Sequence, residues 1–215
     1  MIHETLWDVV VYYFIWWLVK IQFLLFWRER VSGRAHIPRR GPVLVVANHL
    51  SVADPPAMAM VATRPVWFMG KEELFRMPRL GSIIGRLRCF PVKPDAPDRQ
   101  ALRTAEEHLK RRRMVVIFPE GQISMDGKPQ EFRPGAALIA MRNRVPVIPA
   151  AVAGTPDVIP PGKLGPVYRR TTVRIVFGPE IPLDDLRAKG TTHPVLLEAT
   201  ARMQAAVRGL LATLP

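Results

Sequence analysis

A histidine and an aspartate are spaced so that they could act together in proton transfer. His49 and Asp54 follow the apolar run Val43–Ala47, which predicts a short buried strand ending at Asn48. Two prolines come directly after Asp54, and proline is favoured in the first turn of a helix, so we expect Asp54 to be a helix N-cap. A loop of this length lets the carboxylate accept a hydrogen bond from one imidazole nitrogen. The other nitrogen would then stay basic and could take a proton from a substrate hydroxyl.

A second stretch strengthens this interpretation, because a His with an Asp five residues later also arises by chance, and Asp54 could serve only as a cap. Residues 115–124 read VVIFPEGQIS, an apolar strand followed by Pro119, Glu120 and Gly121. Taken alone, these three residues would be a strand-terminating turn. Because they follow the first stretch along the chain, the two stretches can be considered together.

Four blocks of the chain resemble, in order, the motifs of the glycerolipid acyltransferase family, which includes the 1-acylglycerol-3-phosphate acyltransferases. NHLSVAD at 48–54 resembles the family's NHxxxxD motif, and FPEGQIS at 118–124 resembles its FPEGTRS motif. Residues 85–99 are similar to the block between them, and residues 145–154 to the last block. The resemblance covers roughly residues 33–178.

The resemblance implies transfer of a fatty acyl group from acyl-CoA or acyl-acyl carrier protein to the free hydroxyl of a lysophospholipid. The leading reaction is the conversion of lysophosphatidic acid to phosphatidic acid. His49 would be the general base, Asp54 would fix its tautomer, and Asn48, Glu120 and Gly121 would bind the acceptor. A thioester is already activated, so we expect no metal and no cofactor. Backbone N–H groups of the Glu120-Gly121 turn are candidate oxyanion donors.

The chain departs from the family pattern at Ile123, where the motif arginine would fall and where isoleucine cannot bind phosphate. Arg99 is the most attractive replacement, because it follows Asp98 in the first turn of an expected helix, and a helix N-terminus with a guanidinium suits a phosphate. Each candidate could instead be a solvated charge, and the acceptor could be another lysolipid or an aminoacyl lipid. The candidate cations are Lys71, Lys93, Arg99 and Arg133.

Residues 6–27 predict a membrane-embedded helix, although Lys20 interrupts the apolar run, and a full span needs ~20 apolar residues. On a helix Lys20 shares a side with Trp16 and Trp27, which is typical of an interfacial anchor. Spanning the bilayer and lying in one leaflet both stay open. The start lacks the basic region of a signal peptide. Arginines from 28 to 40 favour a cytoplasmic position for the following domain and contact with acidic headgroups, and hence the inner (cytoplasmic) membrane.

The 215 residues predict an N-terminal anchor over 1–30 and an acyltransferase domain over 31–215. Strands alternating with helices predict an α/β fold, with a central mostly parallel or mixed sheet flanked by helices. The net charge of +13 seeks an anionic partner, and four of the five Trp lie in the first 27 residues, which favours membrane lipid over nucleic acid. A rival interpretation is a non-catalytic membrane protein that binds anionic lipid or RNA. We expect strands at 43–47, 66–69, 89–92, 114–118, 147–153 and 172–177, and helices at 55–62, 71–75, 79–87, 98–112, 134–143 and 194–211.

Overall fold

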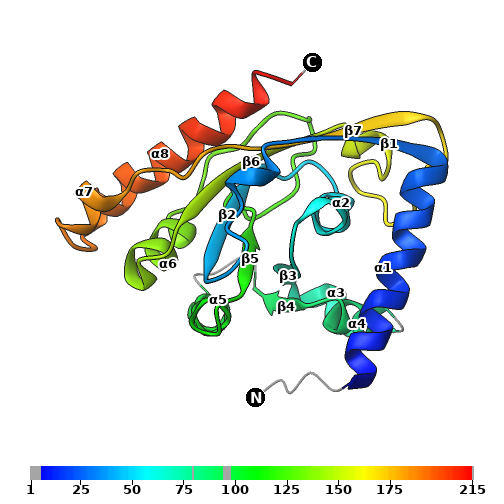
Figure 1. The fold of residues 1–215 in the computed structure, drawn as a ribbon, viewed down its shortest axis with the longest axis horizontal. Coiled ribbons are helices and arrows are strands. Elements are labelled where there is room, and N and C mark those ends of the chain that lie inside the picture. Colours follow the sequence, from blue (N-terminus) through cyan, green and yellow to red (C-terminus); the bar gives the residue numbers. More distant parts are fainter. Residues whose placement is uncertain (1–5, 79, 94–97, 215) are drawn as a thin grey trace.

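The apolar run before His49 forms strand β2 (Val43–Ala47) at the centre of a seven-stranded sheet with the order β1-β7-β6-β2-β5-β3-β4. A computed structural model describes residues 6–78, 80–93 and 98–214 of the chain. Strands β2 to β6 are parallel to one another, β7 is antiparallel to β6, and β1 is parallel to β7. Helices cover both faces of the sheet (Figure 1). The predicted α/β fold with a mostly parallel, mixed sheet is confirmed.

The elements fall close to the predicted ranges, and each expected strand and helix is present. The other strands are β1 (Trp27–Ser32), β3 (Val66–Lys71), β4 (Cys89–Val92), β5 (Met114–Ile117), β6 (Val147–Ala153) and β7 (Thr171–Phe177). The helices are α1 (Leu6–Phe26), α2 (Asp54–Val61), α3 (Glu72–Arg76), α4 (Leu80–Arg86), α5 (Arg99–Lys110), α6 (Gly135–Asn143), α7 (Asp184–Arg187) and α8 (His193–Leu211). Two short 3-10 helices lie at Arg34–His36 and Thr155–Asp157.

Two hydrophobic cores enclose the sheet, one on each face. Val43, Val45 and Ala47 pack on the face covered by α2 and the C-terminal part of α1. Leu44 and Val46 pack on the other face, against α5, α6 and α8. All five side chains are fully buried. A parallel strand covered on both sides needs apolar residues at every position, which explains the unbroken run in the sequence.

Strand β1 was not predicted, because its sequence WRERVS looks like a charged flank. It pairs with β7 from Trp27 opposite Thr171 to Ser32 opposite Val176. Its side chains alternate between covered and exposed, so the two arginines of the strand point to solvent. The strand crosses residue 30, the expected limit of the N-terminal segment, so the sheet begins before that limit.

Helix α1 lies along the domain with one side and presents an apolar side outward. Tyr12 and Phe23 are buried, and the Trp16 indole N–H donates to the Ala59 carbonyl. The window Val9–Phe26 has the length and composition to cross a membrane, and little of it is buried. These features favour association of α1 with a membrane. The exposed large apolar side chains of α1 are Leu6, Trp7, Val10, Tyr13, Phe14, Trp17, Leu18, Ile21, Leu24, Leu25 and Phe26.

Lys20 does not reach outward, and the expectation that it anchors the helix at lipid headgroups is wrong. Its ammonium lies 2.6 Å from a carboxylate oxygen of Glu29 on β1, and both side chains are largely covered. The ammonium is instead satisfied within the domain, by a charge-assisted hydrogen bond to Glu29. The pair fastens α1 to the strand that follows it.

The chain reverses its direction across the sheet between β2 and β5, which are neighbours. The connection from β2 runs through α2 on one face to β3, whereas the connection from β5 runs through α6 on the other face to β6. Ligands of open α/β sheets bind at such a switch point, beyond the carboxyl ends of the strands. His49 follows β2 and Glu120 follows β5, so both candidate residues stand at this point.

Candidate active site

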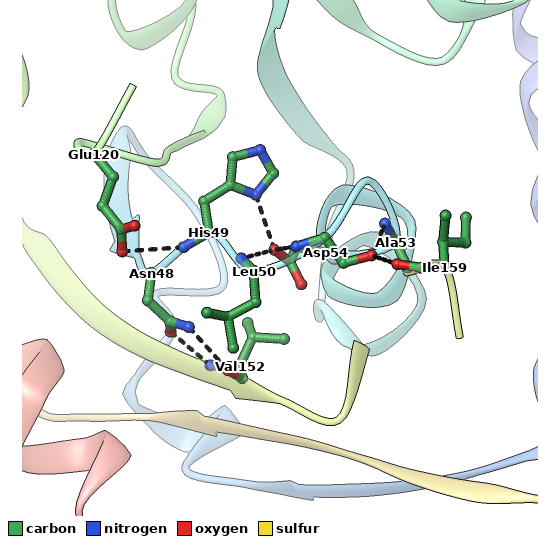
Figure 2. Close-up of polar contacts among 9 residues, drawn as sticks. Asn48, His49, Leu50, Ala53, Asp54, Glu120, Val152 and Ile159 are labelled. Atoms are coloured by element: carbon green, nitrogen blue, oxygen red, sulfur yellow. Dashed lines mark hydrogen bonds and ion pairs between the residues drawn. The ribbon is translucent and has the colours of Figure 1, made fainter. Parts of the chain in front are cut away.

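The Asp54 carboxylate organises the loop after β2 through a single oxygen (Figure 2). Its Oδ2 lies 2.8 Å from Nδ1 of His49 and accepts the backbone N–H groups of Leu50 and Ser51 at 2.7 and 2.9 Å. An ionised carboxylate can only accept, so Nδ1 carries the proton and Nε2 is left with its lone pair. Asp54 is fully buried, and the loop therefore holds the imidazole in one tautomer.

Asp54 is not the N-cap of α2, which corrects the prediction from the sequence. It is the first residue of the helix, the capping position belongs to Ala53, and the helix start has no side-chain cap. The carboxylate turns back toward the loop, where three donors converge on it. The prolines in the first turn lack N–H groups, so the helix needs fewer capping bonds.

The His49 ring rests on Phe118, a residue that the sequence did not single out. Their ring centroids are 4.2 Å apart and the planes are inclined by 17°. The His49 side chain is 16% exposed, and the Asp54 side chain is not exposed. Stacking on one side and the carboxylate at Nδ1 leave the ring few ways to turn. In the sequence, the only indication that Phe118 belongs to the site was its position at the start of the FPEG segment.

The segment after β5 holds both backbone groups of His49. The His49 N–H donates to Oε1 of Glu120 at 3.2 Å, and the His49 carbonyl accepts the N–H of Ser124 at 2.9 Å. Figure 2 shows the Glu120 carboxylate on the side of His49 away from Asp54. The two motifs of the sequence therefore meet at His49, and neither positions the histidine alone.

Burial raises the pKa of the Glu120 carboxyl to about 7. The N–H groups of His49 and Gln130 act in the opposite direction, the negative charge of Asp54 raises the pKa further, and Arg208 lowers it. Glu120 is 2% exposed, and its Oε2 makes no hydrogen bond of good geometry within the described part of the chain. Near neutral pH this carboxyl therefore exchanges between its two protonation states.

Arg133 lies directly against Gly121, beside Glu120. A Cβ on Gly121 would come within 3.1 Å of the Arg133 guanidinium, and Gly121 has a φ of 74°, so glycine suits this turn. The backbone N–H of Arg133 donates to the Pro119 carbonyl at 2.9 Å, so the position of the Arg133 backbone is fixed beside the turn. The Gly121 N–H donates to the Phe118 carbonyl at 3.0 Å and is already used within the turn. Of the two N–H groups considered as oxyanion donors, Glu120 is the better candidate.

Asn48 has a structural position rather than the acceptor-binding one that we expected. Its side-chain amide donates to the Val152 carbonyl and accepts the Val152 N–H, both at 2.9 Å (Figure 2). The residue is fully buried. The two bonds extend the pairing of β2 and β6 by one step beyond Ala47, so they hold the loop at the strand end.

The other three candidate cations lie at or after strands β3 and β4, which are farther from β2 and His49 than β5 is. Lys71 ends β3, Lys93 follows β4, and Arg99 begins α5. Strand β4 is three places from β2, or roughly 14 Å at ordinary strand spacing. The carboxylate of Asp98 already accepts the N–H groups of Gln100, Ala101 and Lys93. The helix start that made Arg99 attractive therefore carries a negative group of its own.

Within the described residues, no group of three or more His, Cys, Asp or Glu side chains could hold a metal ion. The site thus combines a buried carboxylate, a histidine with a free Nε2, a carboxyl of raised pKa and a neighbouring guanidinium. The fold and the site define an α/β protein with a hydrogen-bonded His-Asp pair at the carboxyl ends of its parallel strands.

The chain belongs to the acyltransferase family, since the family model described as Acyltransferase matches residues 28–153. A lyso-ornithine lipid O-acyltransferase of Pseudomonas aeruginosa is 31% identical over 85% of this chain and 67% of its own length. A chloroplastic 1-acyl-sn-glycerol-3-phosphate acyltransferase of Brassica napus is 29% identical over 74% of this chain. The match covers 46% of the Brassica protein, so the chain spans about half the length of that relative.

A solved structure has the same fold over almost the whole chain. It is the 1-acyl-sn-glycerophosphate (LPA) acyltransferase PlsC from Thermotoga maritima, which aligns with a TM-score of 0.74 and 28% identity. The alignment covers 99% of this chain and 83% of the other. The resemblance noted from the motifs is thereby confirmed at the level of the family and of the fold.

Proposed function

We propose that the chain transfers a fatty acyl group from a thioester to the hydroxyl of lysophosphatidic acid, which gives phosphatidic acid. The observation that carries the proposal is the 2.8 Å contact between Nδ1 of His49 and the buried Asp54 carboxylate. It leaves Nε2 as the proton acceptor, and Asp54 stabilises the imidazolium that forms. The relatives named as 1-acyl-sn-glycerol-3-phosphate acyltransferases support this choice of acceptor.

The proton and the acyl group move in a closed sequence. His49 takes the hydroxyl proton while the acceptor oxygen bonds to the thioester carbonyl carbon. The carbon–sulfur bond then breaks, and the leaving thiolate takes the proton from the imidazolium. The thioester supplies the activation, so neither a metal nor a protein nucleophile is required. Acyl-CoA and acyl-acyl carrier protein both fit as donors.

Arg133 is the cation that we propose for the acceptor's phosphate. It lies beside the Glu120-Gly121 turn, whereas Ile123 offers no charge. A guanidinium can bind phosphate through two parallel hydrogen bonds. Lys71 and Lys93 stand farther along the same edge and would add to the positive potential there. Glu120 acts by holding the His49 backbone.

A second candidate acceptor is a lyso-ornithine lipid or a similar amino lipid. Two observations favour it: isoleucine replaces the motif arginine at 123, and a relative of 31% identity is named for this reaction. Asp126, three residues later, is exposed and would attract an ammonium group. The chemistry at His49 is the same for both acceptors.

We further propose that α1 holds the protein at the inner membrane, with the domain on the cytoplasmic side. The outward apolar side of α1 would lie among lipid chains, and the segment 1–30 would act as the anchor of a domain that includes 31–215. The arginines that follow the helix support this orientation, because basic residues favour the cytoplasmic end of a membrane segment.

A lysolipid panel tests the proposal. The purified chain would be given an acyl-CoA, or acyl-acyl carrier protein, with one lysolipid at a time, and thiol release would be recorded together with the lipid product. We expect release that requires a lysolipid and is fastest with lysophosphatidic acid. Faster release with lyso-ornithine lipid would select the second candidate. Lipid binding with no thiol release from any pair would contradict both and favour a non-catalytic lipid-binding protein.

A further inference from the structure

A set of large apolar side chains outside α1 is exposed at the active-site edge of the sheet. Met125 is 68% exposed, Leu164 54%, Val167 37% and Tyr168 56%. We call these four residues the apolar rim. Met125 belongs to the segment after β5, and the other three belong to the loop between β6 and β7, which begins at the carboxyl end of β6.

The loop between β6 and β7 is held in shape, so it presents its apolar side chains in a fixed way. Val158 at its base is buried in the core that also holds Phe23 and Trp27. The N–H of Val167 donates to the carbonyl of Val158 at 2.7 Å, which closes the loop. Arg169 pairs with Asp157 across the same base.

The rim continues the outward apolar side of α1. The Tyr168 ring lies 4.7 Å from the Phe26 ring and stacks on Trp27 at 5.9 Å. The Trp27 indole N–H donates to the Val167 carbonyl. Figure 1 shows the loop, in yellow, beside the C-terminal part of α1. The surface that favours a membrane therefore extends past the end of the helix.

The rim also borders the His49 loop. The Ser51 hydroxyl donates to the Ile159 carbonyl at 2.6 Å, which ties the β6–β7 loop to the loop that contains His49 and Asp54. On the other side Met125 reaches Gly162, where an added Cβ would lie 3.6 Å from its methyl group. Met125 follows Ser124, whose N–H binds the His49 carbonyl.

The charges around the rim are mostly positive. Lys128, Lys163, Arg169 and Arg170 are exposed beside it, while the neighbouring acids are Asp126 and the paired Asp157. Aromatic and aliphatic side chains mixed with basic residues suit the headgroup layer of an anionic bilayer. A soluble partner would not require continuity with α1.

We propose that the apolar rim is a second membrane-contacting surface, which enters the headgroup layer of an anionic phospholipid bilayer beside α1. The lysolipid would then pass from the bilayer to His49 along Met125 and Leu164. This inference rests on the membrane association of α1 given above. It does not depend on which lysolipid is the acceptor.

The test uses an environment-sensitive fluorophore attached to one introduced cysteine at a time in the full chain, which also keeps Cys89. Burial raises the pKa of the Cys89 thiol to about 12, so this cysteine stays protonated and reacts slowly with thiol reagents. Leu164→Cys reports on the rim, and Leu18→Cys reports on the exposed side of α1. Leu197→Cys on α8 is the matched control, because Leu197 is exposed to a similar degree as Leu164, 48% against 54%.

Vesicles of phosphatidylcholine and phosphatidylglycerol should raise the emission at 164 and at 18 by about twofold or more, as an apolar medium replaces water around the label. A lipid-borne quencher should lower both signals, and the label at 197 should stay unchanged. A response at 18 without one at 164 would overturn the rim while sparing the anchor. Silence at both positions would overturn the anchor itself, and a response at 197 equal to that at 164 would show that the contact is unspecific.

Discussion

The backbone N–H of His49 donates to the Glu120 carboxylate at 3.2 Å, so the proposed base is held by a residue of the turn that follows the neighbouring strand β5. The two residues are 71 positions apart in the sequence, but they are in contact at the switch point because β2 and β5 are neighbours in the sheet. Because Glu120 carries a raised pKa, this link also connects the position of His49 with pH.

Glu120 should make the stability of the fold depend on pH. Its pKa is about 7 in the folded chain and 4.5 without perturbation, so the folded state binds more protons between these values. The contribution is fully present below pH 4.5 and is lost as the pH rises through 7, at most about 1.4 kcal/mol for each pH unit in that window. Urea unfolding of wild type and Glu120→Gln at pH 5 and pH 8 measures it. We expect the variant to lose less stability than wild type over this interval, and an equal loss in both proteins would contradict the assignment.

Asn48 should matter for stability and not for acceptor affinity. Asn48→Ala leaves the N–H and carbonyl of Val152 without partners in a buried place, which should lower the free energy of unfolding by about 2–4 kcal/mol. Denaturant unfolding gives this value, and steady-state kinetics on the folded fraction gives the acceptor KM. A large rise in KM with unchanged stability would return Asn48 to the acceptor site.

Helix α1 should contribute to the core as well as to membrane association. Phe23→Ala removes a ring that is 3% exposed and should lower the free energy of unfolding by about 3–5 kcal/mol in detergent. Phe14 on the same helix is 64% exposed, so Phe14→Ala should change it by less than about 0.5 kcal/mol. Equal effects of the two substitutions would show that α1 does not pack on the domain as described.

Arg133 should govern the affinity for a phosphate-bearing acceptor. Loss of a charge-assisted contact in Arg133→Ala should raise the acceptor KM about 10–100-fold and leave the donor KM nearly unchanged. Arg99→Ala is the matched control and should change the acceptor KM by less than about twofold, because the Asp98 carboxylate already occupies the helix start. Ile123→Arg should be neutral or inhibitory. A larger rise of the acceptor KM in Arg99→Ala than in Arg133→Ala would reject the assignment, and so would a lower acceptor KM in Ile123→Arg.

Much of the fold followed from local patterns that the packing preserves. The run Val43–Ala47 correctly predicted a buried strand, and the helix expected at 98–112 is present as α5, with Asp98 as its N-cap. Strand β1 was not predicted because it is an edge strand with alternating arginines and therefore has no apolar run. Its partner β7 lies about 140 residues later, and pairing over such a distance leaves no local signal.

The sequence predicted which residues form the candidate site better than it predicted where their side chains point. The spacing of His49 and Asp54 predicted their contact, but not that Asp54 would turn away from the helix start. The sequence favoured Arg99 because of its place at the start of a helix. Arg133 instead lies against Gly121 because the segment after β5 folds back on itself. Lys20 shared a side with two tryptophans, yet Glu29 on the next strand determined where it points. For Lys20 and Arg133 a residue outside the local segment decided the outcome, whereas the partners of Asp54 lie in its own loop.

The role of His49 as the general base is the central claim, and acyl transfer by His49→Ala tests it most directly. Thiol release from acyl-CoA would be followed with a saturating lysolipid acceptor, and circular dichroism would establish that the variant is folded. Losing the base should lower turnover about 10²–10⁴-fold, with Asp54→Asn also strongly impaired because Nδ1 loses its acceptor. Near-native turnover in folded His49→Ala would contradict the mechanism proposed here.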